Sequence, residues 1–106
     1  AANRLARHAF HQYIVRVAAE RRDGLVDHLR EAGIDSAVYY PVPLHQQPCF
    51  AAAPGLRPAR GFPEAEAASR ETLALPIYPG LRAEDLRRVA DQTRAFLAAP
   101  GPARTP

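Results

Sequence analysis

The chain has 106 residues, a length that suits one domain, and 47 % of them are apolar, as in ordinary globular proteins. No apolar run approaches the roughly 20 residues needed to cross a bilayer, and no secretory leader is visible, so we expect a cytoplasmic protein without a membrane span. The single cysteine, Cys49, excludes an internal disulfide and a multi-cysteine metal site, and we expect an unreactive thiol there rather than a nucleophile.

The basic residues are all arginine, 14 in number, and the net charge is +3. A basic composition is typical of nucleic-acid binding, but surfaces that follow phosphates need a cluster or stripe of one sign. Here the arginines alternate with acids, for example in residues 20–23 and 84–91, which favours solvated helix faces. We therefore expect no nucleic-acid partner.

The first predicted element is a strand over residues 9–17, which are rich in β-branched and aromatic side chains. Alternation along this strand would place Tyr13 and Val15 on one face. His11 and Gln12 fall inside the same segment, and we expect them to pack in the sheet with satisfied polar partners.

A helix and a second strand are predicted next. Asp23 can cap a helix whose apolar stripe runs from Leu25 to Ala32, and Gly33 suits the left-handed position that ends a helix. Residues 34–40 then predict a strand. The adjacent Tyr39 and Tyr40 would point to opposite faces of that strand, so that one of them packs in the core.

Residues 41–62 contain five prolines and predict a long loop, with a short helical turn somewhere in residues 46–53. A loop of this length in a compact domain is usually functional or disordered. His45 follows two of the prolines, whose fixed backbone angles let a loop present a side chain in a defined direction. His45 is therefore the leading candidate for a binding residue, and a plain surface histidine is the alternative.

The last third of the chain predicts a helix over residues 64–73 with Pro63 in its first turn, a short strand over 74–77 and a helix over 83–98. Residues 100–106 are expected to form a disordered tail, which leaves residues 1–99 as a single domain. The order β-α-β-loop-α-β-α predicts an α/β (α+β) fold, with helices covering one face of a small sheet.

Three stretches carry a family resemblance: HAFHQYIVRV with the following RRDGLVDHLREAGI, then YYPVPLHQQPCF, then FPEAEAASRETLALPIYPGL before the final helix. In order and spacing they resemble the C-terminal small domain of DegT-type nucleotide-sugar aminotransferases, which are fold-type I enzymes dependent on pyridoxal phosphate (PLP). The resemblance implies a three-stranded sheet backed by helices, docked on a larger PLP-binding domain. It also implies a homodimer that transfers an amino group, usually from glutamate, to a keto nucleotide sugar.

By the same resemblance, the loop that contains His45 borders the active site, so that His45 and Tyr40 are the candidate substrate-binding residues. No residue is a catalytic or cofactor-binding candidate, because the chain contains no lysine to form the imine with PLP. We expect the chain alone to be inactive and to bind no PLP specifically. The four histidines lack metal-ligand spacing, so no metal is expected. A freestanding docking or dimerisation module derived from such a domain is the alternative function.

Overall fold

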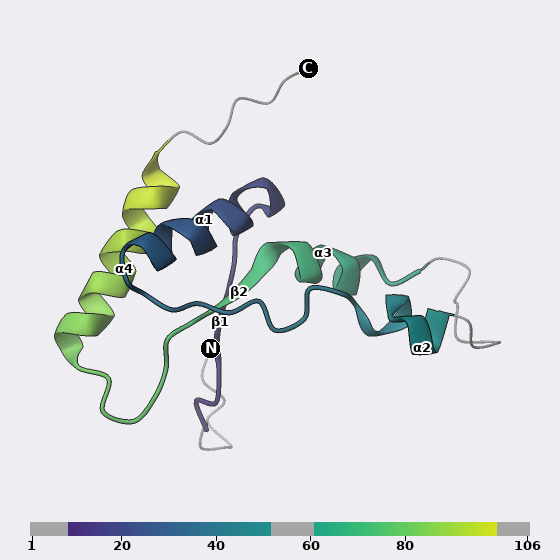
Figure 1. Cartoon of the computed structure of the whole chain (residues 1–106), viewed down its shortest axis with the longest axis horizontal. Helices are drawn as coiled ribbons and strands as arrows, with labels where there is room; N and C mark the ends of the chain where they lie inside the picture. The colour runs from purple at the N-terminus through teal and green to yellow at the C-terminus, as the bar shows by residue number, and fades with distance from the viewer. Residues whose placement is uncertain (1–8, 52–60, 100–106) are drawn as a thin grey trace.

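The computed structural model describes residues 9–51 and 61–99 (Figure 1), so the predicted tail at 100–106 lies outside the described residues. Within these ranges, no helix is long and apolar enough to cross a membrane. The described elements, in chain order, are β1 (Tyr13–Arg16), α1 (Ala19–Glu31), the 3-10 helix η1 (Leu44–Gln46), α2 (Pro48–Ala51), α3 (Pro63–Glu71), β2 (Thr72–Leu75) and α4 (Ala83–Ala98). This arrangement confirms the predicted mixed α/β class with helices packed on a small sheet.

The sheet has two strands in the described part of the chain, β1 and β2, which pair antiparallel with Val15 opposite Leu73. The strand predicted over residues 34–40 is wrong, because only Ala37 pairs there, as an isolated bridge to Ala74. The two residues exchange both backbone hydrogen bonds, at 3.1 and 2.7 Å. The chain bends at Tyr39 and then enters the proline-rich loop, so the ladder does not extend.

Both strands also differ in length or position from their predictions. Phe10 has a φ of 51°, which is incompatible with extended backbone, and β1 begins only at Tyr13, after His11 and Gln12. The predicted helix over 64–73 ends earlier, at Glu71, because Leu73 belongs to β2. Pro63 does occupy the first turn of α3, as predicted.

Helix α1 begins at Ala19, four residues before the predicted capping residue Asp23. The Asp23 carboxylate instead accepts a hydrogen bond from Arg22 Nε at 2.5 Å. The predicted end is confirmed: Gly33 has a φ of 70°, and its N–H donates to the Arg30 carbonyl oxygen at 2.9 Å. Only glycine adopts this left-handed conformation without steric cost, so the glycine stops the helix.

The core lies between α1 and the sheet. Leu25 and Leu29 of α1 are fully buried and pack with Ile34 and Leu73. Val15 of β1 is partly buried and packs against this cluster. Helix α4 lies beside α1 (Figure 1).

Gly24 permits the close approach of α1 and α4. A Cβ atom at this position would come within 3.0 Å of the Phe96 ring, closer than side chains normally approach. The absence of a side chain at Gly24 therefore lets the Phe96 ring rest against the backbone of α1.

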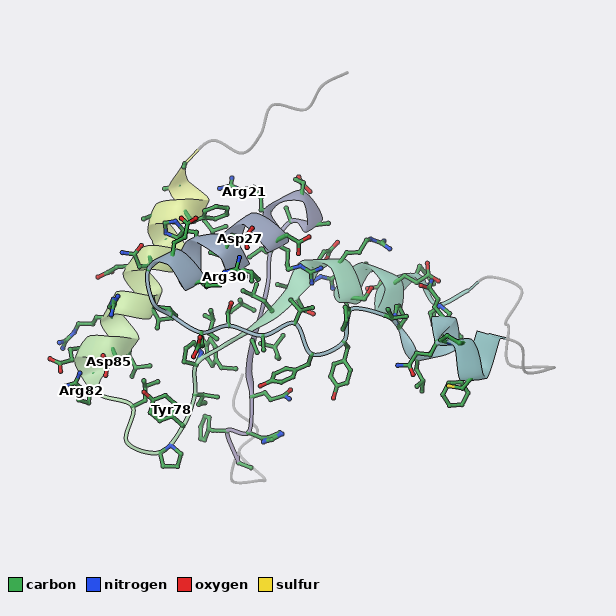
Figure 2. All side chains as sticks on the ribbon, viewed as in Figure 1. Arg21, Asp27, Arg30, Tyr78, Arg82 and Asp85 are labelled. Carbon is green, nitrogen blue, oxygen red and sulfur yellow. The ribbon has the colours of Figure 1, made fainter. Side chains whose placement is uncertain are left out.

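Three arginines that we expected on solvated faces bind the ends of other helices instead. Arg21 of α1 donates to the carbonyl oxygens of Phe96 and Ala99 at the end of α4, and its guanidinium lies 4.7 Å from the centre of the Phe96 ring (Figure 2). Arg88 of α4 donates to the Ala32 carbonyl at the end of α1. Each helix therefore supplies a cation to the negative end of the other.

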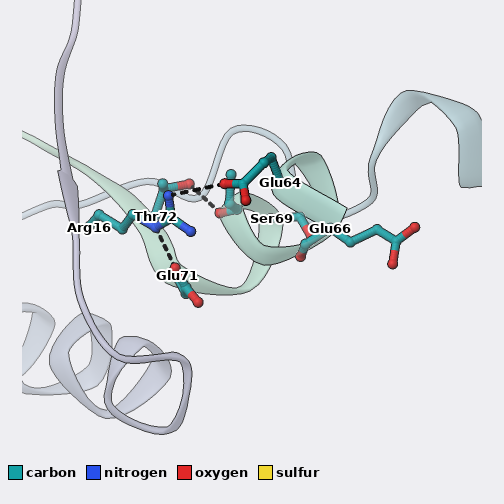
Figure 3. A network of polar contacts seen from close by, with 7 residues as sticks. Arg16, Glu64, Glu66, Ser69, Glu71 and Thr72 are labelled. Carbon is teal, nitrogen blue, oxygen red and sulfur yellow. Dashed lines mark hydrogen bonds and ion pairs between the residues drawn. The ribbon is translucent and has the colours of Figure 1, made fainter. Parts of the chain in front are cut away.

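Arg22 is the third of these arginines, and its side chain is only 12 % exposed. Its Nη1 donates to the Ser69 and Thr72 carbonyl oxygens at the end of α3, at 3.1 and 3.2 Å. At the same end of α3, Arg16 of β1 binds the Glu71 carboxylate (Figure 3). These contacts attach α3 to α1 and β1, which positions the first turn of α3.

Candidate functional site

The proline-rich loop presents His45 from a single turn of 3-10 helix. Pro43 is buried, and its carbonyl oxygen accepts the Gln46 N–H at 2.9 Å, which closes η1 around His45. The short α2 follows directly at Pro48, so the helical turn predicted within residues 46–53 is present. The stiff loop therefore holds the histidine in one direction.

The His45 side chain is largely covered, with 19 % of its surface exposed. Its Nε2 atom lies 3.0 Å from Glu66 Oε1 on the first turns of α3. On another side, its ring packs against Phe62, with ring centres 4.8 Å apart. These contacts fix the imidazole and argue against a freely mobile surface histidine.

Glu66 is ionised in this setting. The hydrogen bond from His45 is the largest cause that lowers the pKa of Glu66, and the Phe62 backbone N–H adds a second bond to the same carboxylate, while partial burial opposes both. The position near the positive end of α3 favours the same charge. A charged carboxylate therefore lies beside His45 at neutral pH.

An apolar cavity of about 350 Å³ opens beside the histidine. Among the described residues, its wall includes Leu44, His45, Phe50, Phe62 and Ala65, which come from the loop and from α3. Such a surface, apolar with one polar group, is typical of small-molecule sites in which one hydrogen bond orients the ligand.

Neither tyrosine of the YY pair packs in the core, contrary to our prediction. Tyr39 is 54 % exposed and Tyr40 is 73 % exposed, and their rings lie 6.5 Å apart. Both remain outside the core because the expected strand is absent at these residues. Among the described residues, the ring contact of Tyr40 is with Tyr39, whereas His45 contacts Phe62 and Glu66.

A second, more polar cavity of about 310 Å³ borders the Ala37–Ala74 bridge. Ser36 lines it, and its buried Oγ atom has no hydrogen-bond partner among residues 9–51 and 61–99. The prediction that His11 and Gln12 pack inside a strand is wrong, because both precede β1. The side chains that can offer hydrogen bonds to this cavity come from three chain segments: His11, Gln12, Asp35, Ser36, Tyr39 and Tyr78.

The remaining candidates show no chemistry of their own. Cys49 is exposed. His28 packs against Phe96 with ring centres 5.4 Å apart. Among the residues that the structure describes, no three His, Cys, Asp or Glu side chains gather as a metal ion would require.

The sequence pattern singles out His45 as a candidate but gives no reason to select Glu66, which contacts His45 in the structure, or Ser36, which lines the second cavity. By sequence, Glu66 falls within the predicted helix over 64–73 and Ser36 within the predicted strand over 34–40, and neither pattern indicates a site. Both residues are linked to a site only by tertiary contacts. Glu66, for example, is 21 residues away from His45 along the chain. No spacing rule within one element could bring that pair together.

Comparison with known proteins places these features in a family. Residues 1–94 match the model of the DegT/DnrJ/EryC1/StrS aminotransferase family. A pleiotropic regulatory protein of Geobacillus stearothermophilus is 45 % identical over 89 residues, which cover 84 % of this chain and 23 % of the relative. The dTDP-3-amino-3,4,6-trideoxy-alpha-D-glucose transaminase of Streptomyces venezuelae is 43 % identical over 79 % of this chain and 22 % of its own length.

A solved structure shares both the fold and the sequence. S. venezuelae DesV in complex with a ketimine intermediate superposes with a TM-score of 0.74 at 40 % identity, over 86 % of this chain and 24 % of DesV. The chain thus spans less than a quarter of the length of each relative described here.

Proposed function

The chain belongs to the DegT/DnrJ/EryC1/StrS aminotransferase family, and from this premise we propose that it is the C-terminal small domain of a nucleotide-sugar transaminase. The larger enzyme would move an amino group from glutamate to a keto group on a nucleotide-linked sugar, as a cytoplasmic homodimer. The observation that carries the proposal is the combined likeness in sequence and fold to DesV over 86 % of the chain.

The residues present do not fit a PLP site. The cofactor needs a lysine amine for its covalent attachment, and the chain contains none. We therefore assign PLP to a large domain outside this chain, and we expect residues 1–99 to be inactive without it.

His45, with Tyr40 at the start of its loop, is our candidate for contact with the nucleotide sugar. Three observations support His45: its ring is fixed by Glu66 and Phe62, it is partly accessible, and it lines the apolar cavity. The support for Tyr40 is weaker: its side chain is largely exposed and it lies at the start of the same loop.

Activity of the intact protein tests the proposed function. The full open reading frame that contains this segment should form 2-oxoglutarate from glutamate in the presence of PLP and a keto nucleotide sugar, tested as dTDP and UDP forms. The 106-residue chain alone should form none. Activity of the short chain would contradict the assignment of PLP to another domain. A reading frame that ends without a PLP domain would favour the docking-module alternative.

The role of His45 is tested by His45→Ala in the same intact enzyme. We expect KM for the nucleotide sugar to rise or turnover to fall by roughly tenfold, the effect of one lost hydrogen bond to substrate. Gln46→Ala is the matched control, because Gln46 is an exposed neighbour in the same turn. Unchanged kinetics for His45→Ala, with an unchanged melting curve, would return His45 to the surface-residue interpretation.

A further inference from the structure

The contact between His45 and Glu66 determines which nitrogen of the imidazole is free. A neutral imidazole has one N–H donor and one lone-pair acceptor, and an ionised carboxylate only accepts. Since Nε2 lies 3.0 Å from Glu66 Oε1, Nε2 must be the atom that carries the hydrogen. The lone pair is then on Nδ1.

The Nδ1 atom is the imidazole nitrogen that does not contact Glu66. It has no hydrogen-bond partner among the described residues, and it is not one of the buried polar atoms that lack a partner. His45 is one of the residues that line the apolar cavity, so a molecule bound there would lie beside its ring.

Glu66 has further neighbours besides His45. Its carboxylate also receives the Phe62 backbone N–H, and Gly61 lies so close that an added Cβ atom would be 3.3 Å from Glu66 Oε1. Figure 3 shows the Glu66 side chain extending away from the cluster around Arg16. The carboxylate therefore lies where it can orient the imidazole through its contact with Nε2.

We propose that Glu66 is a positioning residue, which holds His45 in the Nε2–H tautomer so that Nδ1 accepts a hydrogen bond from a hydroxyl group of the sugar nucleotide. This inference rests on the proposed function, in which His45 contacts that substrate. In this arrangement, the substrate group that binds Nδ1 of His45 is a hydrogen-bond donor. In the other tautomer Nδ1 would carry the hydrogen and would need an acceptor on the substrate.

The first test measures the tautomer directly in the 106-residue chain by ¹⁵N NMR of labelled histidine above the pH at which imidazole is protonated. Wild-type His45 should show a protonated Nε2 and a lone pair on Nδ1. Glu66→Gln keeps an acceptor oxygen and should retain this pattern. Glu66→Arg offers only donors and should invert it. Glu64→Arg is the control, because Glu64 is 92 % exposed and lies on the same turn.

The second test uses the intact enzyme. Glu66→Arg should raise KM for the nucleotide sugar at least about tenfold, the loss of one hydrogen bond, with a melting temperature like that of Glu64→Arg. Glu66→Gln should stay within about threefold of wild type, because it retains an acceptor for Nε2–H. Glu64→Arg introduces the same charge change, so it corrects for long-range attraction of the anionic substrate.

The outcomes of the two tests are separable. A wild-type Nδ1–H tautomer, or a Glu66→Arg variant that keeps both the tautomer and KM of wild type, overturns the inference. An intact enzyme that aminates no nucleotide sugar contradicts the proposed function, and the NMR result still decides whether Glu66 sets the tautomer.

Discussion

At the scale of single residues, Glu66 connects a helix start to a loop. Its charge suits the first turns of α3, its carboxylate accepts the Phe62 N–H, and the same group binds His45. Asp85 has a similar place on α4, where Arg82 lies beside it (Figure 2) and the Arg82 bond is the largest cause of its lowered pKa. Both carboxylates therefore favour their charged forms in the folded chain.

These two lowered pKa values predict acid sensitivity. The unfolded chain binds protons more readily at both sites, so the free energy of unfolding should be highest above the ordinary values of 4.5 and 3.8 and should fall as pH drops through the lower folded pKa values. Thermal melts from pH 7 downward would show this loss. The double variant Glu66→Gln, Asp85→Asn should give a shallower pH dependence, and an identical slope would contradict the assignment.

The sequence could predict His45 but not its partner. Prolines on either side of a histidine are a local signal, and the structure places His45 in a stiff turn, as that signal implies. The contact with Glu66 depends on how α3 packs against α1 and β1, which no local pattern contains. In the same way, the Ser36 hydroxyl lacks a hydrogen-bond partner among the described residues, and this is apparent only once the chain is folded with Ala37 paired to Ala74.

At the scale of elements, the bounds of a helix could be predicted where a single periodic pattern spans the whole element. Helix α4 has the predicted bounds, because Leu86, Val89 and Phe96 repeat at helical spacing over the whole element. The start of α1 was misplaced because Asp23 looked like a cap, whereas Arg21 and Arg22 extend the helix by binding distant carbonyl groups. Such tertiary contacts leave no periodic signal.

The Arg22 contact with the end of α3 predicts a stability effect. Arg22→Ala should lower the free energy of unfolding by about 1–3 kcal/mol, because the Ser69 and Thr72 carbonyl oxygens lose a charged donor in a partly buried place. Chemical denaturation would measure it. Arg87→Ala, at an exposed position of α4, should change stability by less than about 0.5 kcal/mol. Equal effects of the two substitutions would show that the Arg22 contact contributes little.

At the scale of the whole molecule, the buried core is small and much apolar surface is open. In the described part of the chain, the fully buried large side chains are Leu25, Leu29 and Leu73. The large apolar side chains with more than a third of their surface exposed are Phe10, Tyr13, Ile14, Tyr39, Tyr40, Val42, Leu44, Phe50, Phe62, Tyr78, Leu86 and Leu97. A surface of this kind fits the proposal that the chain is one domain of a larger protein.

This surface predicts that the isolated chain has modest stability and self-associates. Sedimentation velocity over a range of concentrations should show an average mass that rises with concentration, since open apolar patches on two copies of the chain can bury each other. The double variant Tyr40→Ser, Leu44→Ser should reduce this association while it leaves the Leu25 core intact. A monomer independent of concentration, with a high melting temperature, would contradict the expectation.

The exchange of arginines between α1 and α4 also bears on how the domain fluctuates. Arg21 closes the last turn of α4 and Arg88 closes the last turn of α1, so detachment of either helix exposes unpaired carbonyl groups on both. Neither helix can fray or detach independently of the other, so the two helices open as one cooperative unit. Amide protons at the carboxyl ends of the two helices should therefore exchange with solvent through a shared opening, although those ends lie far apart in the sequence.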